Sequence, residues 1–392
     1  MKKCLRDIDI KNKTVIIRCD FNVPLKNGKI MDNTRIVKSL ETIKHCIKQQ
    51  AKIILLSHLG RVKTEEDKKD KSLKPVAKEL EKLLEKKVVF VPKTRGEEVE
   101  SKVKKLKPGE VLLLENTRFE DIKGKLESGN DDELGTYWAS LGDVFVNDAF
   151  GTVHRAHASN VGIASSISTS CIGFLIEKEL TALEELNCPN KPFIVILGGA
   201  KVGDKIGVIE NIVEKADKIL IGGGMAFTFL KAEGYEIGNS LCDNEHLAFC
   251  EKMTKKYPEK LILPVDVKTT SEFSNDTKVE VKDMNELDFN DIALDIGENT
   301  VEIFKNYLKD ASFVLWNGPL GVYEFENYKQ GTDKVLKYLA ENNIKTLLGG
   351  GDIVAAAKNA KVTDKIYHIS TGGGATLEFL EGKTLPGLDA IK

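Results

Sequence analysis

The sequence predicts an α/β protein with two parallel-sheet domains. Short apolar runs rich in β-branched residues alternate along its 392 residues with segments of helical apolar spacing, which is the pattern of βαβ units. Many of these runs end in glycine clusters or in polar side chains. A chain of this length also exceeds the roughly 250–300 residues that one hydrophobic core usually holds. We therefore expect two sheets, each carrying ligand-binding residues at its strand ends.

The composition describes a globular chain suited to a reducing compartment. Hydrophobic residues make up 41% of the chain and charged residues 30%. The N-terminus lacks the apolar region of a signal peptide, and the longest uncharged segment, 156–176, is too rich in Ser and Gly to span a bilayer. Seven cysteines are scattered without a C-x-x-C motif, which argues against disulfides and structural zinc. We expect a cytoplasmic protein with no membrane partner.

Charge is distributed unevenly along the chain. Residues 1–170 carry 33 Lys and Arg against 25 Asp and Glu, a net charge of +8, whereas the remainder carries 25 against 35, a net charge of −10. A basic half suits an anionic ligand. Nucleic acid is the competing explanation, but most of the lysines lie in mixed-charge runs with few interleaved aromatic residues. We therefore expect no nucleic-acid partner.

In the first half, basic side chains follow the ends of predicted strands. We expect these strands at 15–19, 52–56, 111–114 and 144–146, with a helix beginning near Asn33. Arginine suits bidentate recognition of phosphate or carboxylate. Four of the seven arginines in this half stand after a strand or in the first turn of that helix, which predicts a site for a small anion. The basic candidates are Arg35, His58, Arg61, Arg118, His154 and Arg155.

The second half opens with a βαβ unit whose turns are rich in glycine. Two apolar runs, 193–197 and 219–221, each end in a glycine cluster, and a helical pattern lies between them. Lys201 and Lys205 stand four residues apart in the first turn, so at a helix start they would share one face. Two ammonium groups beside the backbone N–H groups of a helix N-terminus form a phosphate site.

Three further apolar runs in this half end in glycine turns: W-N-G-P-L-G, L-L-G-G-G-D and I-S-T-G-G-G. None is a Walker A loop, and none is a convincing G-x-G-x-x-G motif. Several such turns predict convergence on one polyanionic ligand. Glu324 and Asp352 match a nucleotide and its metal, because Mg²⁺ is typically held by one or two carboxylates plus substrate phosphates.

The two halves meet at a predicted helix. Apolar spacing predicts this helix over 172–186, and the segment C-P-N-K-P after it marks a boundary. We assign residues 1–170 to the first domain, 171–187 to a hinge helix and 188–379 to the second domain. The tail, about 380–392, is expected to pack back on the first domain. The predicted fold is two Rossmann-like parallel-sheet domains joined by a hinge helix, with a deep interdomain cleft.

Phosphoryl transfer is the reaction class that these features favour. No nucleophile–base pair stands out in the sequence, and no His/Cys cluster has metal-ligand spacing. Phosphoryl transfer needs mainly positioning and charge stabilisation from the protein. A carboxylate acceptor would already be ionised at neutral pH and would need no general base, which explains why no base is found.

Nine motifs, in order and spread over nearly the whole chain, resemble the phosphoglycerate kinase family. Each is a weak signal alone, but together they are highly specific. They are R-C-D-F-N-V-P (Arg18–Pro24), S-H-L-G-R (Ser57–Arg61), L-E-N-T-R-F (Leu114–Phe119), N-D-A-F-G-T-V-H-R-A-H (Asn147–His157), G-G-A-K-V-G-D-K (Gly198–Lys205), G-G-G-M-A-F-T-F (Gly222–Phe229), W-N-G-P-L-G-V-Y-E (Trp316–Glu324), G-G-G-D (Gly349–Asp352) and S-T-G-G-G-A (Ser370–Ala375).

The resemblance implies a glycolytic kinase that interconverts 1,3-bisphosphoglycerate and ADP with 3-phosphoglycerate and ATP. It further implies Mg²⁺ as cofactor, a monomer, and in-line transfer after domain closure, because the substrates would be held on separate domains. The residues that would hold the phosphoglycerate are Asp20, Phe21, Asn22, Arg35, His58, Leu59, Gly60, Arg61, Arg118, His154 and Arg155.

The resemblance also implies a nucleotide site in the second domain. Lys201 and Arg35 would neutralise charge on the transferring phosphoryl group, and Asp352 would bind Mg²⁺. Gly351 and Gly373 would be further catalytic positions, where helix N-termini point at the phosphates. The nucleotide-binding residues would be Lys201, Lys205, Gly223, Gly224, Gly297, Asn317, Pro319, Glu324, Gly350, Gly351, Asp352 and Ile353.

Three positions depart from the family pattern. Ile353 stands where the family usually has Ser or Thr, which removes a hydroxyl expected near the nucleotide phosphates and puts nucleotide affinity in doubt. Val62 and Glu298 each replace a usual proline, and both look like changes in loop stiffness.

Three alternatives of other classes remain to be weighed. A non-catalytic relative would be favoured by loss of Lys201, Arg35 or Asp352, but all three are present. An NAD-dependent oxidoreductase would want a G-x-G-x-x-G after an early strand and an acid about 20 residues later, and that arrangement is absent. Steep salt-dependent retention on DNA would favour a nucleic-acid-binding module.

Overall fold

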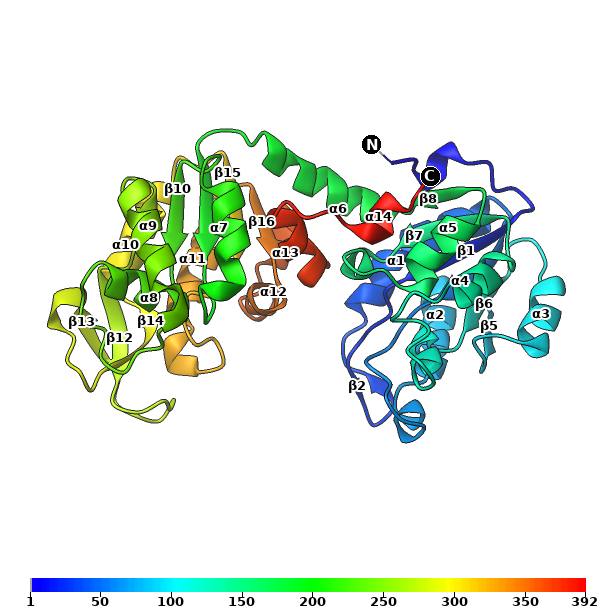
Figure 1. Ribbon diagram of the computed structural model, residues 1–392, viewed down its shortest axis with the longest axis horizontal. Coiled ribbons are helices and arrows are strands. Elements are labelled where there is room, and N and C mark those ends of the chain that lie inside the picture. The colour runs from blue at the N-terminus through cyan, green and yellow to red at the C-terminus, as the bar shows by residue number, and fades with distance from the viewer. Residues whose placement is uncertain (1) are drawn as a thin grey trace. The chain divides into compact units, whose positions relative to one another are not determined.

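The protein folds into two compact units. The computed structural model describes residues 2–392. The first unit comprises the residues up to Thr181 together with Thr384–Lys392, and the second comprises Ala182–Lys383 (Figure 1). The α6 helix, Phe174–Glu184, begins in the first unit and ends in the second. No helix within residues 2–392 is both long and apolar enough to cross a membrane.

The first unit is organised around a parallel sheet with strand order β5-β6-β4-β1-β7-β8, six strands among the residues described. Every neighbouring pair in this sheet is parallel. A separate short hairpin, β2–β3, turns at Asn27-Gly28. The strands are β1 Thr14–Cys19, β2 Leu25–Lys26, β3 Lys29–Ile30, β4 Lys52–Leu56, β5 Val88–Val91, β6 Val111–Leu114, β7 Val144–Asp148 and β8 Ser170–Ile172.

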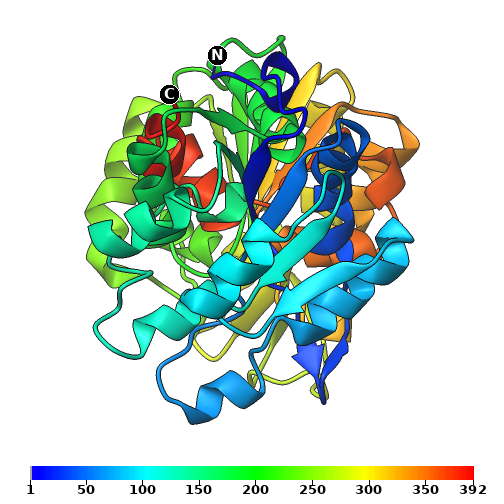
Figure 2. The ribbon, with the colours of Figure 1, turned by 90° about the vertical axis from the view of Figure 1, so that its right-hand side faces the viewer.

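Helices lie on both sides of this sheet (Figure 2). The α1 and α2 helices pack together, as do α4 and α5. Right-handed crossovers between parallel strands require such an arrangement on the two faces. The helical segments are η1 Leu5–Asp7, α1 Thr34–Lys48, η2 Glu66–Lys69, α2 Lys74–Leu84, α3 Glu97–Lys104, η3 Thr117–Asp121, α4 Asp132–Ala139, η4 Phe150–Thr152, η5 Ala158–Gly162, α5 Ile163–Ser166 and α14 Pro386–Asp389.

The second unit contains a parallel sheet of the same size in the described chain, with strand order β11-β10-β9-β15-β16-β17. Every neighbouring pair is again parallel. The prediction of two parallel-sheet α/β domains is therefore confirmed. The strands of this unit are β9 Phe193–Leu197, β10 Lys218–Ile221, β11 Leu261–Ile262, β12 Asp266–Thr270, β13 Glu280–Asp283, β14 Ile292–Ile296, β15 Phe313–Asn317, β16 Thr346–Gly349 and β17 His368–Ile369.

The helices of the second unit bury an apolar core against this sheet. Trp316 of β15 and Phe304 of α10 are both fully buried in it. The helical segments of the unit are η6 Glu185–Asn187, η7 Gly203–Lys205, α7 Ile206–Ile212, α8 Gly224–Ala232, η8 Asn244–His246, α9 Leu247–Lys256, η9 Met284–Glu286, α10 Glu298–Leu308, η10 Glu326–Tyr328, α11 Gln330–Glu341, α12 Gly351–Asn359, η11 Thr363–Lys365 and α13 Gly374–Leu380.

A small antiparallel sheet, β13-β12-β14, is an element that the sequence pattern does not reveal. Two of its strands, β12 and β13, are short and rich in Asp, Lys, Glu and Thr, so they lack the continuous apolar run of a buried parallel strand. Asp266 begins β12 rather than ending a strand. This sheet matters for the site, because β14 contributes to the wall of a cavity described below.

The end of the first unit differs in detail from the helix predicted over 172–186. Residues 170–172 form β8, which pairs with β7 in the first sheet, and the helix begins two residues later at Phe174. The C-terminal segment returns to the same unit. Gly387 donates its N–H to Val153 O at 2.8 Å and accepts from Asn147 Nδ2 at 3.0 Å, and Lys392 N donates to Ser170 Oγ at 2.9 Å.

Candidate active site

The strand order of each sheet reverses direction at a central strand. In the first unit, β1 lies between β4 and β7, and in the second unit β9 lies between β10 and β15. Ligands of open α/β sheets bind outside the carboxyl ends of the strands at such a reversal. In both units, most of the residues singled out from the sequence follow the carboxyl ends of these parallel strands, whereas Gly297 follows β14 of the antiparallel sheet.

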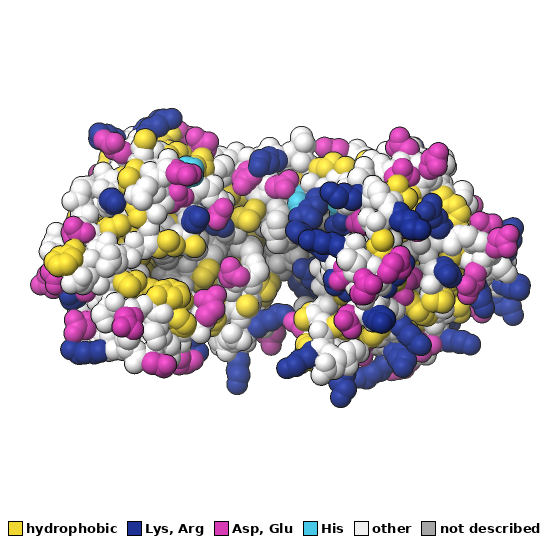
Figure 3. Space-filling view, turned by 60° about the horizontal axis from the view of Figure 1, so that its bottom comes forward, with side chains coloured by type: hydrophobic (Ala, Val, Ile, Leu, Met, Phe, Trp, Pro, Cys, Tyr) yellow, Lys and Arg dark blue, Asp and Glu magenta, His cyan; other side chains and the backbone are white. Residues whose placement is uncertain are grey.

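A group of basic side chains, which we call the arginine cluster, occupies this position in the first unit. It consists of Arg18, Arg35, Arg61, Arg118 and Arg155 with His58, His154 and His157. Figure 3 shows a dense group of Lys and Arg side chains beside a histidine on this unit. Arg61, Arg118, Arg155 and His157 line a cavity of about 900 Å³, so the structure brings together basic residues from distant parts of the sequence.

The turns after β1 and β4 are tied to one another by hydrogen bonds. Phe21 N donates to Ser57 Oγ at 2.8 Å, and Gly60 N donates to Asn22 Oδ1 at 2.8 Å. Asp20 forms an ion pair with Arg35, which lies in the first turn of α1. These bonds hold the Asp20–Asn22 turn and the Ser57–Gly60 turn in a fixed relation, and they orient the Arg35 guanidinium.

The turn after β6 joins the same network. Asn116 accepts the Leu59 N–H at 3.1 Å and donates from Nδ2 to Leu59 O at 2.8 Å. Arg118 Nη1 donates to Asp121 at 2.6 Å, whereas Arg118 Nε is buried and has no hydrogen-bond partner among the described residues. A buried donor without a partner is costly, so a guanidinium edge of this kind is suited to an anionic ligand.

The arginines of the cluster control the charge of its histidines. Burial lowers the pKa of His58 well below its usual value, and the nearby guanidiniums of Arg18 and Arg118 add to this shift. Burial likewise lowers the pKa of His157 to about 2. Both imidazoles are therefore neutral at pH 7, and the positive charge of the cluster comes from guanidinium groups, which stay protonated.

Arg18 is a member of the cluster that sequence reasoning missed. It lies on β1 and is fully buried, with Glu127 as its ion-pair partner at 3.9 Å. Arginine is almost never fully buried unless it is paired. A charged residue inside the buried strand 15–19 is the signal that could have identified it. Glu127 lies in a loop and carries no such signal.

The glycine turns of the second unit pack directly against one another. Gly199 N donates to Pro319 O at 2.9 Å, and Gly223 N donates to Leu320 O at 2.9 Å. Gly223 has φ of +65°, and a Cβ placed there would lie 2.7 Å from Gly199 N and O. The turns after β9, β10 and β15 therefore meet backbone to backbone, where no side chain would fit.

Lys201 and Lys205 do not share one helical face, and that prediction is wrong. The α7 helix begins only at Ile206, with Lys205 as its N-cap residue, and Lys201 precedes a short 3₁₀ turn. Lys205 is partly buried and donates from Nζ to Asn317, and burial lowers its pKa. Lys201 is exposed. A turn rich in glycine lacks the propensity to extend the helix back to Lys201.

Two further helices of this unit begin at glycine N-caps. Gly350 precedes α12 and Gly373 precedes α13, and neither helix has a side-chain cap within the described chain. Both glycines have positive φ, and no described atom lies within 4 Å of a Cβ added at Gly351 or Gly373. The space beside these two helix starts is therefore open, and a helix N-terminus beside open space is suited to binding phosphate.

A cavity of about 540 Å³ lies beside the glycine turns that follow β9, β10 and β15 in the second unit. Its volume is in the range typical of small-molecule sites. Apolar side chains such as Phe227 and Leu241 line it together with the glycine turns. The predicted residues that line it are Gly223, Gly224, Pro319, Glu324 and Asp352.

Three predicted nucleotide residues are placed differently. Gly297 is not among the residues that line this cavity; a Cβ there would lie 2.3 Å from the Asp266 carboxylate, so close packing explains the glycine. Asn317 bonds Lys205 and Gly349 O instead of lining the cavity. The Ile353 side chain is fully buried in the core.

Asp295, at the end of β14, also lines this cavity and was not a candidate from the sequence. Burial raises its pKa to about 7, although it accepts N–H bonds from Gly331 at 2.9 Å and Ile296 at 3.0 Å. Lys268 of β12 lies 3.9 Å away. This buried pair links β12 to β14, the strand that contributes to the cavity wall.

Asp352 fits a magnesium ligand. Its carboxylate is exposed in the first turn of α12, and it is close enough to Lys205 to oppose the fall in that residue's pKa. Within residues 2–392, no group of three His, Cys, Asp or Glu side chains could hold a metal ion by itself. One carboxylate beside open helix N-termini suits Mg²⁺, which takes most of its other ligands from phosphates and water.

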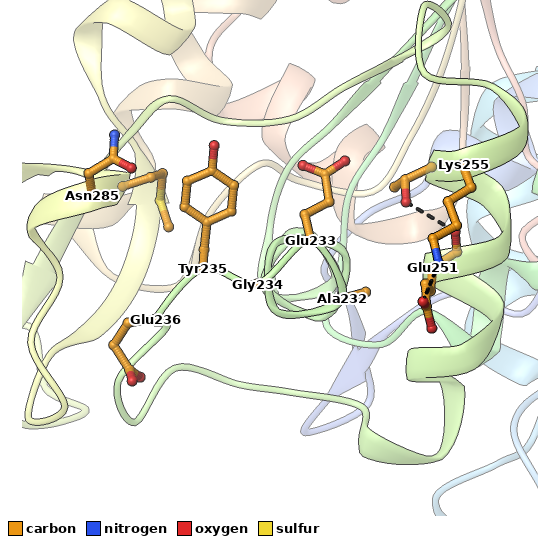
Figure 4. Close-up of a pocket in the computed structure, with 10 residues that line it drawn as sticks. Ala232, Glu233, Gly234, Tyr235, Glu236, Glu251, Lys255 and Asn285 are labelled. Carbon is orange, nitrogen blue, oxygen red and sulfur yellow. Dashed lines mark hydrogen bonds and ion pairs between the residues drawn. The ribbon is translucent and has the colours of Figure 1, made fainter.

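A cavity of about 700 Å³ elsewhere in the second unit has a different character (Figure 4). It is lined by Glu233, Tyr235, Glu236 and Glu251, and none of the residues predicted from the sequence lines it. Glu251 is paired with Lys255 at 2.5 Å. An acidic lining repels phosphates, so this cavity is not the nucleotide site.

The chain is similar to known proteins over its whole length. The family model of phosphoglycerate kinase matches residues 5–383. Phosphoglycerate kinase of Fusobacterium nucleatum subsp. nucleatum is 58% identical, and that of Enterococcus faecalis is 56% identical, each over 100% of this chain and 99% of the relative.

Solved structures agree with these sequence comparisons. Phosphoglycerate kinase from Coxiella burnetii has a TM-score of 0.90 at 41% identity, covering 100% of this chain and 99% of that one. The enzyme from Pyrococcus horikoshii OT3 has a TM-score of 0.85 at 33% identity, with 99% and 98% covered.

Proposed function

The chain belongs to the phosphoglycerate kinase family, and from that premise we propose how its residues carry out the reaction. It is a phosphotransferase with a carboxyl group as acceptor, and it interconverts 1,3-bisphosphoglycerate and ADP with 3-phosphoglycerate and ATP in glycolysis. The observation that carries the assignment of roles is the arginine cluster at the reversal point of the first sheet.

The first unit binds the phosphoglycerate. Guanidinium forks match phosphate and carboxylate oxygens, and the unpartnered Arg118 Nε supplies a donor that an anion would satisfy. The Asp20–Arg35 pair keeps the Arg35 side chain at the carboxyl end of β1. The proposed binding residues are Asp20, Phe21, Asn22, Arg35, His58, Leu59, Gly60, Arg61, Arg118, His154 and Arg155.

The second unit binds the nucleotide. Its apolar cavity of about 540 Å³ has room for an adenosine, and Glu324 and Pro319 line that cavity. The N-termini of α12 and α13 then receive the phosphates, with Lys201 and Lys205 as charged partners. Gly223, Gly224 and Gly350 shape the turns around the ligand, and Asn317, Gly297 and Ile353 support these turns by packing.

Charge stabilisation is the main contribution of the protein to catalysis. Arg35 and Lys201 neutralise the charge that develops on the transferring phosphoryl group, and the helix N-termini at Gly351 and Gly373 add backbone donors. Asp352 holds Mg²⁺, which when bound neutralises charge on the nucleotide phosphates. The acceptor carboxylate is already ionised, so the chain needs no general base.

The two ligands are bound by different units, so in-line transfer requires the units to close on one another. Closure brings the reacting oxygens together and excludes water from the phosphoryl group. We place the enzyme in the cytoplasm as a monomer, without nucleic-acid or membrane partners, in agreement with the scattered cysteines and the mixed-charge lysine runs.

The test is consumption of ATP with Mg²⁺ and 3-phosphoglycerate, read through a coupled dehydrogenase that consumes the acyl phosphate. We expect turnover by the native protein and a loss of at least about 100-fold in Lys201→Ala. Lys256→Ala, an exposed lysine at the end of α9, is the matched control and keeps full turnover. Binding of ATP without any turnover would contradict the assignment as a kinase.

A further inference from the structure

We propose that the buried Arg18 holds His58 in the neutral tautomer that carries its proton on Nε2, which makes this ring a hydrogen-bond donor toward the anionic substrate. The tautomer follows from the structure itself. The role toward phosphoglycerate rests on the proposed function of the first unit.

The contact between Arg18 and one ring nitrogen of His58 decides the tautomer of His58. Arg18 Nη2 lies 3.3 Å from His58 Nδ1. A guanidinium has five N–H donors and no acceptor, so the ring nitrogen that faces it has to accept. In a neutral imidazole one nitrogen accepts and the other donates, and the proton of His58 is therefore on Nε2.

Arg18 is well placed to impose this choice because its guanidinium cannot turn away. The side chain is fully buried, and Nε donates to Ser159 Oγ at 2.7 Å while Nη1 donates to Cys19 O. Glu127 completes the support: it accepts from Ser159 N at 2.9 Å and from Ser159 Oγ at 2.5 Å. Each guanidinium nitrogen thus has its own hydrogen-bond partner, and Nη2, which also lies 3.9 Å from Glu127 Oε1, is bonded to His58.

The surroundings of His58 remove the doubly protonated form. Burial and the guanidiniums of Arg18, Arg118, Arg35 and Arg155 all lower its pKa well below the usual value. At pH 7 the ring is neutral, and either nitrogen could in principle carry the single proton. The hydrogen bond from Arg18 selects between these two forms.

The selected tautomer has a consequence for ligand binding. Nδ1 is occupied by Arg18, so Nε2 is the ring nitrogen available to a ligand. An Nε2–H group donates to a phosphate or carboxylate oxygen, whereas the opposite tautomer would present a lone pair to that oxygen and repel it. Arg18 is therefore a positioning residue that acts through His58.

The experiment is nitrogen-15 NMR of the ligand-free, histidine-labelled full chain at pH 7, with His58 assigned by loss of its signals in His58→Gln. The expected result is a protonated Nε2 and an unprotonated Nδ1 for His58. A protonated Nδ1 in His58, in either charge state, would overturn the inference. This readout needs no turnover, so a failure of the proposed activity would not be mistaken for a failure of the tautomer.

A variant pair then tests the role of Arg18. Arg18→Met is combined with Glu127→Gln, so that no buried charge is left unpaired, and Arg95→Met, at an exposed arginine paired with Glu120, is the control. We expect the double variant to lose the fixed Nε2–H tautomer and to raise the KM for 3-phosphoglycerate about tenfold, with the KM for ADP unchanged. The control should keep both properties. A folded double variant in which His58 still holds only the Nε2 proton would show that Arg18 does not select the tautomer.

Discussion

The two units share a sheet topology but obtain positive potential in different ways. All seven arginines of the chain lie in the first unit, five of them after a β-strand or in the first turn of a helix, and the second unit contains none. The second unit relies instead on open helix N-termini at Gly350 and Gly373, supplemented by Lys201 and Lys205.

On the proposed function, the difference corresponds to two ligands of different kind. A guanidinium fork has a fixed geometry, which suits a small anion whose oxygens must be held in one orientation. Backbone N–H groups at a helix N-terminus carry only partial charge, which suits phosphates that already share a cation. The function of the first unit should therefore be most sensitive to the loss of a side-chain charge. Nucleotide binding by the second unit should be most sensitive to added side-chain volume in its glycine turns.

Arg35→Ala is the change with the largest expected effect. It removes a full charge needed mainly in the transition state, so kcat should fall roughly 10³-fold while the KM for ADP stays within about twofold. Steady-state kinetics in the coupled assay measures both. The control is Arg6→Ala, at an exposed arginine paired with Glu177, and it should change neither kcat nor the KM for ADP. A large loss of ADP affinity with unchanged turnover would refute the catalytic role.

Gly223→Ala should destabilise the second unit and weaken its binding of ADP, because it adds side-chain volume without changing charge. The added Cβ would lie 2.7 Å from Gly199 N and O at a residue with φ of +65°, so we expect a loss of roughly 2–4 kcal/mol in the free energy of unfolding and at least a tenfold rise in the KM for ADP. Gly234→Ala shares a positive φ, +96°, but meets no described atom within 4 Å, and should cost about 1 kcal/mol without a kinetic effect. Equal effects of the two changes would argue against the packed turns.

Arg118→Lys tests the geometry of the fork in the first unit. The charge remains but the planar donor pair is lost, so the KM for 3-phosphoglycerate should rise about tenfold and the KM for ADP should not change. Arg95→Lys, at an exposed arginine paired with Glu120, is the matched control. An unchanged KM in Arg118→Lys would mean that charge alone is recognised there.

Ile353→Thr should have the smallest kinetic effect. The Ile353 side chain is buried in the core, so only its backbone faces the proposed phosphate site at the start of α12. We expect the KM for ADP to change less than twofold, while the buried hydroxyl lowers stability by about 1–3 kcal/mol. A marked fall in the KM for ADP would show that the side chain reaches the nucleotide after all.

The sequence by itself determined the two parallel sheets and the residues at their strand ends. Apolar periodicity is a local property, and the carboxyl ends of parallel strands necessarily share one edge of a sheet. For that reason Arg118 and Arg155, far apart in the chain, could be expected to lie together, and both line the cavity of the first unit. The nine motifs added the family, and with it the reaction.

Only the tertiary structure decided the features that depend on contacts across the chain. These include the burial of Arg18 against Glu127, the start of α7 after Lys201, and the core position of Ile353. The antiparallel sheet and the buried Asp295 belong with them. The burial and the hydrogen-bond partners of a residue depend on residues that are distant in sequence, so no local pattern reveals them. These contacts decide whether a buried group keeps its charge and which ring nitrogen of His58 carries the proton.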